Sequence, residues 1–157
     1  MILVSVTRLH LKSNRYLPNF LWHTATSAWQ IINIHGFVGG RLIQDDCGGY
    51  WTVTMWENRQ AMQDYRNSGA HRRAMPLLQK WCDEAVLVHW EQPDRNLPSM
   101  EEAYLHILED GHFTRLTSPS TSHLEKKVSQ PRFAAITGQP LPLIPRKKSL
   151  VNVLKQI

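Results

Sequence analysis

The stretch YWTVTMWENRQAMQDYRNSGAHRRAMPLLQKWC, which spans Tyr50–Cys82, predicts one strand followed by a helix that is interrupted midway. Tyr50–Trp56 alternates between two kinds of side chain, which is the period-two pattern of a strand with two different faces. Residues 58–67 and 70–82 have helical spacing, and Gly69 lies between them as a helix terminator. The stretch therefore predicts a strand followed by a helix, as in the second half of a unit that combines strands and helices.

The segments on either side supply the remaining elements of this unit. Strands are predicted at Ile2–Leu11, Phe37–Ile43 and Ala85–Trp90, and a helix is predicted at Arg15–Asn33. The complete order is strand, helix, strand, strand, helix, strand, which is the order of the ferredoxin-like split βαβ fold. We therefore expect an α+β fold with a four-stranded antiparallel sheet that carries its helices on one face.

The face of the sheet that these helices leave uncovered leads to a prediction about assembly. Trp51, Val53 and Met55 alternate along one strand and point together toward this face. A contiguous apolar patch of this kind is rarely left in water by a monomeric protein. We therefore expect a homodimer in which two sheets pack face to face.

The composition of the chain changes between Trp90 and Pro93. All six Trp residues lie at or before the first of these positions, whereas seven of the nine Pro residues lie at or after the second. The change predicts a packed domain over residues 1–92 and a C-terminal appendage over residues 93–157.

The appendage is expected to contain one helix and an extended tail. A capping pattern that begins at Ser99 predicts the helix at about 99–110, and a Pro-rich basic tail follows it. Residues 1–95 carry 10 basic and 8 acidic side chains, and residues 96–157 carry 8 and 5. The excess of positive charge is therefore assigned mainly to the last third of the chain.

The overall composition indicates a globular protein and excludes several classes of partner. Hydrophobic residues make up 42% of the 157 residues, charged residues make up 20%, and the net charge is +5. No apolar run approaches the ~20 residues of a membrane helix, and the N-terminus lacks the features of a signal peptide. No single predicted element shows a basic face with interleaved aromatic residues. We expect neither a membrane nor a nucleic-acid partner, and a cytoplasmic location is the default expectation.

Metal binding is not predicted. Cys47 and Cys82 form no CxxC pair, and the eight His residues show no spacing of a known metal motif. Both cysteines are expected to be free thiols.

Three segments resemble the dimeric α+β barrel superfamily, which includes the antibiotic-biosynthesis monooxygenases. They are GFVGGRL (Gly36–Leu42), the strand YWTVTMWEN, and RNSGAHRRAMPLLQKWCDEAVLVHW (Arg66–Trp90). The resemblance covers residues 1–92 and is nearest to the branch named DUF3291, which LEDGHFTRLTSPSTSHL in the tail also resembles. It implies a dimeric α+β barrel, but the superfamily includes cofactor-independent oxygenases, haem degraders, decarboxylases, isomerases and proteins without a known ligand, so it implies no single reaction.

The haem-degrading members of this superfamily offer one specific comparison. They carry an aromatic residue ten positions before a His that ligates the haem iron. Tyr65 is the matching aromatic residue here, but Met75 is found where the His is expected, and His71 lies four residues earlier. A protein without a cofactor is therefore the main expectation, and haem binding remains an alternative.

The junction at Ser68–Arg73 supplies the candidates for catalysis. His71 follows the Gly break and opens a helix, and His is the usual acid or base near neutral pH. Arg41 or Arg72 could hold an anionic group of a substrate. The alternative is structural: His71 would cap the preceding helix, and Arg72 would be a solvated surface residue.

A pocket between the helices and the sheet is expected to have aromatic walls with a few polar groups. The predicted wall residues come from two helices and one strand, and they are Trp22, His23, Trp29, Trp56 and Tyr65. Trp29 could instead be a core residue. His89 could face the same cavity from a strand, but a packed, hydrogen-bonded role is the simpler interpretation.

Three functions are compatible with these residues. The first is a monooxygenase-like or isomerase-like enzyme that acts on a small hydrophobic molecule. Such an enzyme needs no cofactor if the substrate itself forms a carbanion that reacts with O₂. The second is a non-catalytic protein that binds a small ligand, with haem as one possibility, and the third is an interaction protein that uses its basic tail.

Overall fold

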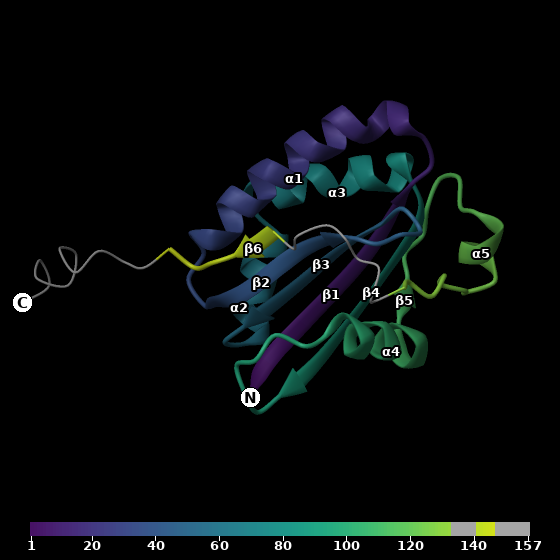
Figure 1. Ribbon diagram of the computed structural model, residues 1–157. Coiled ribbons are helices and arrows are strands. Elements are labelled where there is room, and N and C mark those ends of the chain that lie inside the picture. The colour runs from purple at the N-terminus through teal and green to yellow at the C-terminus, as the bar shows by residue number, and fades with distance from the viewer. Residues whose placement is uncertain (133–140, 147–157) are drawn as a thin grey trace, which may run out of the picture.

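The computed structural model describes residues 1–132 and 141–146, and within them the chain forms one antiparallel sheet with helices on both faces (Figure 1). The strands are β1 (Ile2–Leu11), β2 (Phe37–Gln44), β3 (Gly49–Trp56), β4 (Cys82–Gln92), β5 (His112–Phe113) and β6 (Leu141–Leu143). The helices are α1 (Leu17–Ile32), α2 (Arg59–Arg66), α3 (Gly69–Trp81), α4 (Met100–Asp110) and α5 (Thr121–Leu124), and a 3-10 turn, η1, spans Asn14–Tyr16.

The predicted α+β ferredoxin-like fold is confirmed, but the sheet is larger than expected. Its strand order is β5-β4-β1-β3-β2-β6, so the four predicted strands form the centre. The two additional strands are short pieces of the C-terminal appendage. β5 pairs with β4 and β6 pairs with β2, so each covers one edge of the central sheet.

The helices α1, α2 and α3 cover one face of the sheet, and their ends follow from local chemistry (Figure 1). The side chain of Asn58 accepts a hydrogen bond from the backbone N–H of Ala61, which caps α2. Gly69 has a φ angle of 58°, a left-handed conformation that suits glycine, and the chain turns there from α2 into α3. A core that includes Leu3, Ile31 and Trp56 joins this layer to the sheet.

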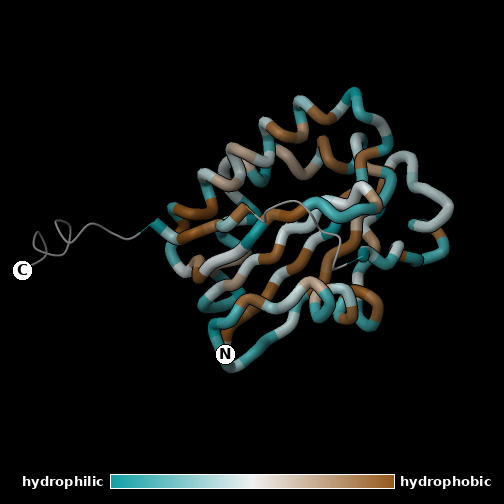
Figure 2. Tube along the Cα trace, in the orientation of Figure 1, coloured by the Kyte–Doolittle hydropathy of each residue, from teal (hydrophilic) through white to brown (hydrophobic). Residues whose placement is uncertain are grey.

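The opposite face of the sheet is covered by the chain's own α4, so the expectation of a bare face is wrong. Apolar and polar positions alternate along the strands (Figure 2). Trp51, Val53 and Met55 lie on the α4 side and are almost completely buried within a single chain. They share one core with residues of α4, namely Met100, Ala103, Tyr104 and Ile107.

This position of α4 removes the reason for which a homodimer was predicted. The face that two sheets would share is already buried without a second subunit. The helix itself begins beside Ser99, whose side chain accepts the backbone N–H of Glu102, as the capping pattern predicted. A homodimer therefore remains a prediction that needs a different interface, and the division of the chain at residue 92 also remains a prediction.

In the described residues no helix is both long enough and apolar enough to cross a bilayer. Residues 133–140 and 147–157 of the predicted extended tail lie outside the described residues.

Two neighbouring residues of α4 provide a test of this packing. Ile107 is 1% exposed and Leu105 is 52% exposed. We expect Ile107→Ala to lower the free energy of unfolding in urea by about 2–5 kcal/mol, because it leaves a cavity against the sheet. The matched Leu105→Ala variant should change it by less than about 0.5 kcal/mol. Equal losses in the two variants would contradict the described orientation of α4.

Candidate functional site

A cavity of about 210 Å³ lies between the sheet and the layer formed by α1, α2 and α3. Its floor is formed by two pairs of hydroxyl residues on neighbouring strands, Ser5 opposite Thr54 and Thr7 opposite Thr52. Most of the remaining lining is apolar. The appendage also contributes to the walls through Thr114, Leu116 and Leu143.

His71 lies at the start of α3 and lines this cavity. Its backbone N–H donates to Oε1 of Gln30 at 3.0 Å, and its ring Nδ1 lies 3.3 Å from the carbonyl oxygen of Arg66. A carbonyl oxygen only accepts, so Nδ1 carries the proton in this contact, and Nε2 of the neutral ring is then unprotonated. Burial lowers the pKa of His71, which keeps the ring neutral near pH 7.

Tyr65 forms the aromatic wall beside His71. Its ring centroid lies 4.6 Å from that of His71 and 5.4 Å from that of Trp56. The Tyr65 hydroxyl donates to the carbonyl oxygen of Ser27 at 3.4 Å, and burial raises the pKa of the phenol. Tyr65 therefore stays protonated and acts as a wall rather than as a base. The indole Nε1 of Trp56 donates to Oγ1 of Thr54, which holds the second ring against the floor.

Two further histidines line the cavity. His89 lies on β4 and its side chain forms no hydrogen bond with any described residue. Burial lowers the pKa of His89, and the nearby charges of Arg59 and Arg66 lower it further. His23 of α1 packs its ring 5.6 Å from that of Trp81. His89 is thus a second neutral imidazole, and its ring nitrogens have no hydrogen-bond partner among the described residues.

Four of the eight predicted site residues lie together around this cavity, and four do not. Those that line it are His23, Trp56, Tyr65 and His71. Trp22 and Trp29 do not line it, because the side of α1 that packs inward carries Phe20 and Ile31 instead. Their spacing of seven residues correctly indicated that they share one side of the helix, but that side faces outward.

The two predicted anion-binding arginines also lie away from the cavity. Alternation along β2 places Leu42 at the cavity and Arg41 on the face of α4. There Arg41 Nη2 donates to the carbonyl oxygen of Pro98, Nε has no partner among the described residues, and burial lowers the pKa of Arg41. Arg72 is exposed on α3. Among described residues, the cavity wall contains one cationic arginine, Arg66.

The hydroxyl floor was not predicted, although the sequence contains a signal for it. Ser5 and Thr7 alternate with apolar residues along β1, and Thr52 and Thr54 do the same along β3. All four are in phase with Trp56, which was predicted to face the pocket. Polar residues that point to the same face of the sheet as a predicted wall residue therefore indicate the rest of that wall.

The residues of this cavity do not fit a haem group. A volume of about 210 Å³ is below the range of about 300–1,000 Å³ that is usual for drug-sized ligands, and haem is a large ligand of this kind. Met75 lines the cavity at the position where the haem-degrading members of the superfamily carry the His that ligates the iron. No step of a reaction is assigned to haem.

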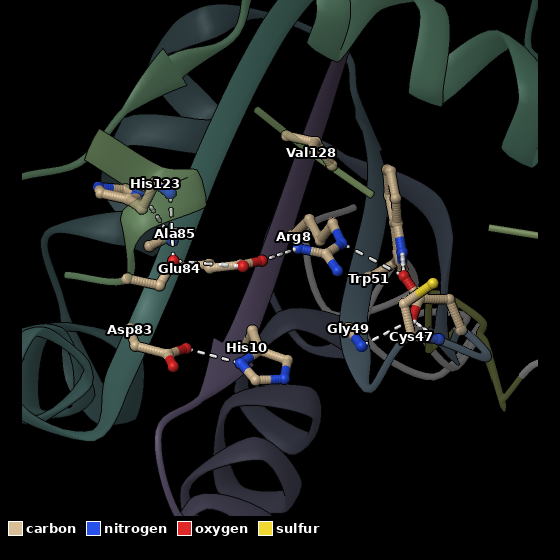
Figure 3. A network of polar contacts seen from close by, with 12 residues as sticks. Arg8, His10, Cys47, Gly49, Trp51, Asp83, Glu84, Ala85, His123 and Val128 are labelled. Atoms are coloured by element: carbon tan, nitrogen blue, oxygen red, sulfur yellow. Dashed lines mark hydrogen bonds and ion pairs between the residues drawn. The ribbon is translucent and has the colours of Figure 1, made fainter. Parts of the chain in front are cut away.

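A separate polar network is buried on the opposite face of the sheet, between Arg8 and the β2–β3 turn (Figure 3). Asp45 accepts hydrogen bonds through Oδ2 from Arg8 Nε and Trp51 Nε1, and through Oδ1 from the backbone N–H groups of Cys47 and Gly49. Arg8 Nη1 also contacts Glu84 at 2.7 Å. Four donors occupy the Asp45 carboxylate, so its proximity to Asp46 and Cys47 does not indicate a metal site.

Comparison with known proteins gives one family and a consistent fold. Residues 24–77 match the family model described as antibiotic biosynthesis monooxygenase. The matched segment includes Trp56, Tyr65 and His71. A comparison with curated proteins gives no match. The resemblance to the DUF3291 branch remains a prediction.

Three solved structures are similar to this chain over most of their own length. SnoaB from Streptomyces nogalater, described as a cofactor-independent oxygenase, is 15% identical with a TM-score of 0.51, and the alignment covers 62% of this chain and 97% of SnoaB. Rv0793 from Mycobacterium tuberculosis is 10% identical with a TM-score of 0.54, covering 60% and 97%. A conserved protein from Methanosarcina mazei is 11% identical with a TM-score of 0.54, covering 59% and 94%. At these identities the likeness shows the fold.

Proposed function

We propose that this protein is a monooxygenase-like enzyme that oxidises a small hydrophobic aromatic molecule in the cavity, with no bound cofactor. The observation that carries the proposal is His71, a half-buried and neutral imidazole whose Nε2 is unprotonated, at the wall of a mostly apolar cavity. The match to the monooxygenase family over residues 24–77 also supports it.

The proposed reaction needs a substrate with an acidic CH₂ group next to an aromatic ketone. His71 takes one proton from this carbon, and the resulting carbanion transfers an electron to O₂. Recombination of the two radicals forms a C–O bond, and return of the proton gives a hydroperoxide. Loss of water then leaves a ketone, so the overall change is R₂CH₂ + O₂ → R₂C=O + H₂O. The substrate is oxidised, and O₂ is both the oxidant and the source of the new oxygen atom.

The other wall residues have supporting roles in this proposal. Hydroxyl groups on the floor, such as those of Thr7 and Thr52, would donate hydrogen bonds to the enolate oxygen as negative charge develops there. The rings of Trp56 and Tyr65 would hold the aromatic part of the substrate and exclude water. His89 is the second candidate for the base, because its side chain also lines the cavity.

Oxygen uptake is the direct test. We expect the purified protein to consume O₂ when it is mixed with fused-ring aromatic ketones that carry an acidic CH₂, with one O₂ consumed per ketone formed. Mass spectrometry after reaction under ¹⁸O₂ should find one labelled atom in the product. The same mixture under nitrogen is the control.

Other outcomes would favour the alternative functions. Conversion of a substrate without O₂ uptake would indicate an isomerase, in which the base returns the proton to a different carbon. Binding of the ketone without any conversion would indicate a non-catalytic ligand-binding protein. The alternative of an interaction protein depends on the basic tail, of which residues 147–157 lie outside the described residues.

A further inference from the structure

The outer surface of α1 carries an apolar stripe that the proposed reaction does not use. Trp22 and Trp29 lie two helical turns apart and are 68% and 62% exposed. Leu21 and Ala25 are exposed beside them. The helix contains no Asp, Glu, Lys or Arg, so its solvent side is uncharged as well as aromatic. Exposed large apolar side chains that gather on one side of a helix indicate an interaction surface.

Cations are found at both ends of this stripe. Lys12 and Arg15 are exposed just before the N-terminal end of α1. Arg146 lies at the C-terminal end, where its backbone N–H donates to the carbonyl oxygen of Ile32. The guanidinium of Arg146 lies 5.5 Å from the ring centroid of Trp29, so the aromatic stripe and a positive charge are in direct contact.

The neighbouring helix α3 adds positive charge to the same layer. α3 lies beside α1 over the sheet (Figure 1), and its exposed residues include Arg72, Arg73 and Lys80. It contains no Asp or Glu. Among described residues, none of the three forms an ion pair with a carboxylate, and neither do the cations at the ends of α1. The layer therefore combines unpaired cations with exposed tryptophans.

The cavity opens on this same helical layer. Three of its wall residues are exposed, namely Arg66 of α2 and Met75 and Gln79 of α3. Most of the cavity is apolar, so its ligand belongs to the class of molecules that partition from water into membranes. The entrance and the aromatic, cationic surface thus lie on one layer of the molecule.

Although the composition predicts no membrane partner, we propose that the outer surface of α1 and α3 docks on a bilayer that contains anionic phospholipids. Trp22 and Trp29 would enter the interfacial region, which Trp favours, and the surrounding cations would contact headgroup phosphates. A single-stranded nucleic acid is the other anionic partner to consider. It is disfavoured because α1 has no cation along its aromatic stripe, whereas nucleic-acid grooves place cations along the backbone between stacking rings.

Vesicle co-sedimentation of the full chain tests this surface. We expect the protein to bind vesicles of equal parts phosphatidylcholine and phosphatidylglycerol, to bind phosphatidylcholine vesicles much less, and to dissociate at high salt. Trp22→Ala and Trp29→Ala should each lower the partition coefficient about tenfold or more, because each removes a large apolar group from the interface. The double variant Arg72→Gln, Arg73→Gln should lower it about 30-fold and weaken the salt dependence.

The double variant Lys126→Gln, Lys127→Gln is the control, since it removes two exposed positive charges outside this layer, one of them ion-paired with Glu125, and it should have a much smaller effect. Equal binding of wild type and all variants, or no binding to anionic vesicles, would overturn the proposal. Tighter binding to a single-stranded oligonucleotide, or a dimer that dissociates in the Trp variants by light scattering, would assign the stripe to a different partner and overturn it as well. No substrate is present in these assays, so their outcome is independent of the proposed oxygenase activity.

Discussion

Replacing His71 with alanine is expected to lower kcat/KM for the oxygen-dependent reaction by about 10²–10⁴-fold, which is the usual contribution of a general base. The substitution removes the contact of the ring Nδ1 with the carbonyl oxygen of Arg66, but the hydrogen bond to Gln30 comes from the backbone N–H and survives, so the variant should still fold. The measurement is the initial rate of O₂ uptake at limiting substrate. Arg72→Ala is the matched control, since Arg72 is the next residue along the helix but does not line the cavity, and it should retain the wild-type rate.

A wild-type rate in His71→Ala would exclude this residue as the base. If His89→Ala then lost activity instead, the base would be His89, and the reaction scheme would otherwise stand. Loss of activity in both variants would indicate that the two neutral imidazoles are required together. The three outcomes are distinct because the side chains of His71 and His89 form no hydrogen bond with each other.

The pH dependence of the same reaction has a predicted direction. His71 works as a base only when it is unprotonated, and burial lowers its pKa below the ordinary value of about 6.5. The value of kcat/KM should therefore be constant around neutral pH and should fall as the pH decreases through the lowered pKa. The free energy of unfolding should also fall as the pH decreases, because below pH 6.5 the unfolded chain binds more protons at His71 than the folded protein does. The acidic limb of the rate profile should be absent from the residual activity of His71→Ala.

Replacing Asp45 with alanine is expected to lower the free energy of unfolding by about 3–5 kcal/mol, because it leaves a buried cation without one of its two carboxylates. Arg8 and the Asp45 side chain are completely or almost completely inaccessible to water, at 1% and 0% exposure. The substitution also removes the acceptor of Trp51 Nε1 and of the two backbone N–H groups in the turn. Urea denaturation monitored by circular dichroism gives the loss.

The neighbouring Asp46→Ala variant is the control, because Asp46 forms its ion pair with exposed Arg132 and its loss should cost about 0–1 kcal/mol. A second variant separates the charge from the packing. Removing the cation and its second carboxylate as well, in Arg8→Met with Glu84→Gln and Asp45→Ala, should be less destabilising than Asp45→Ala alone, since no unpaired charge is then buried. A triple variant that is less stable than Asp45→Ala would contradict this account of the network.

Local pattern was sufficient to predict the central elements. The alternation in Tyr50–Trp56, the N-cap at Asn58 and the break at Gly69 all depend on neighbours within a few residues, and the structure has the corresponding elements. The pocket residues Tyr65 and His71 follow from the same elements, because they lie on the side of the helices that faces the sheet. The order of the elements then led to the ferredoxin-like fold.

The errors at Arg41, Trp22 and Trp29 have a common cause. The periodicity of a strand or a helix shows which residues share a side, but it does not show which side faces the cavity. In β2 the choice between Arg41 and Leu42 depends on packing against α4 and β6, which are distant in sequence. In α1 the tryptophans were assumed to face inward because they are large and apolar, whereas Phe20 and Ile31 occupy that side.

The sequence by itself therefore determined the elements, their order and the part of the pocket that lies near Gly69, since all of these depend on short-range periodicity and backbone conformation. Tertiary packing determined what covers each face. α4 buries Trp51, Val53 and Met55, which short-range pattern had assigned to a second subunit. The same packing brings the exposed tryptophans of α1 beside the cations of α3, although α1 has no Lys or Arg and the tryptophan of α3, Trp81, is buried. Contacts between segments far apart in the chain decide such surfaces, and no local pattern contains them.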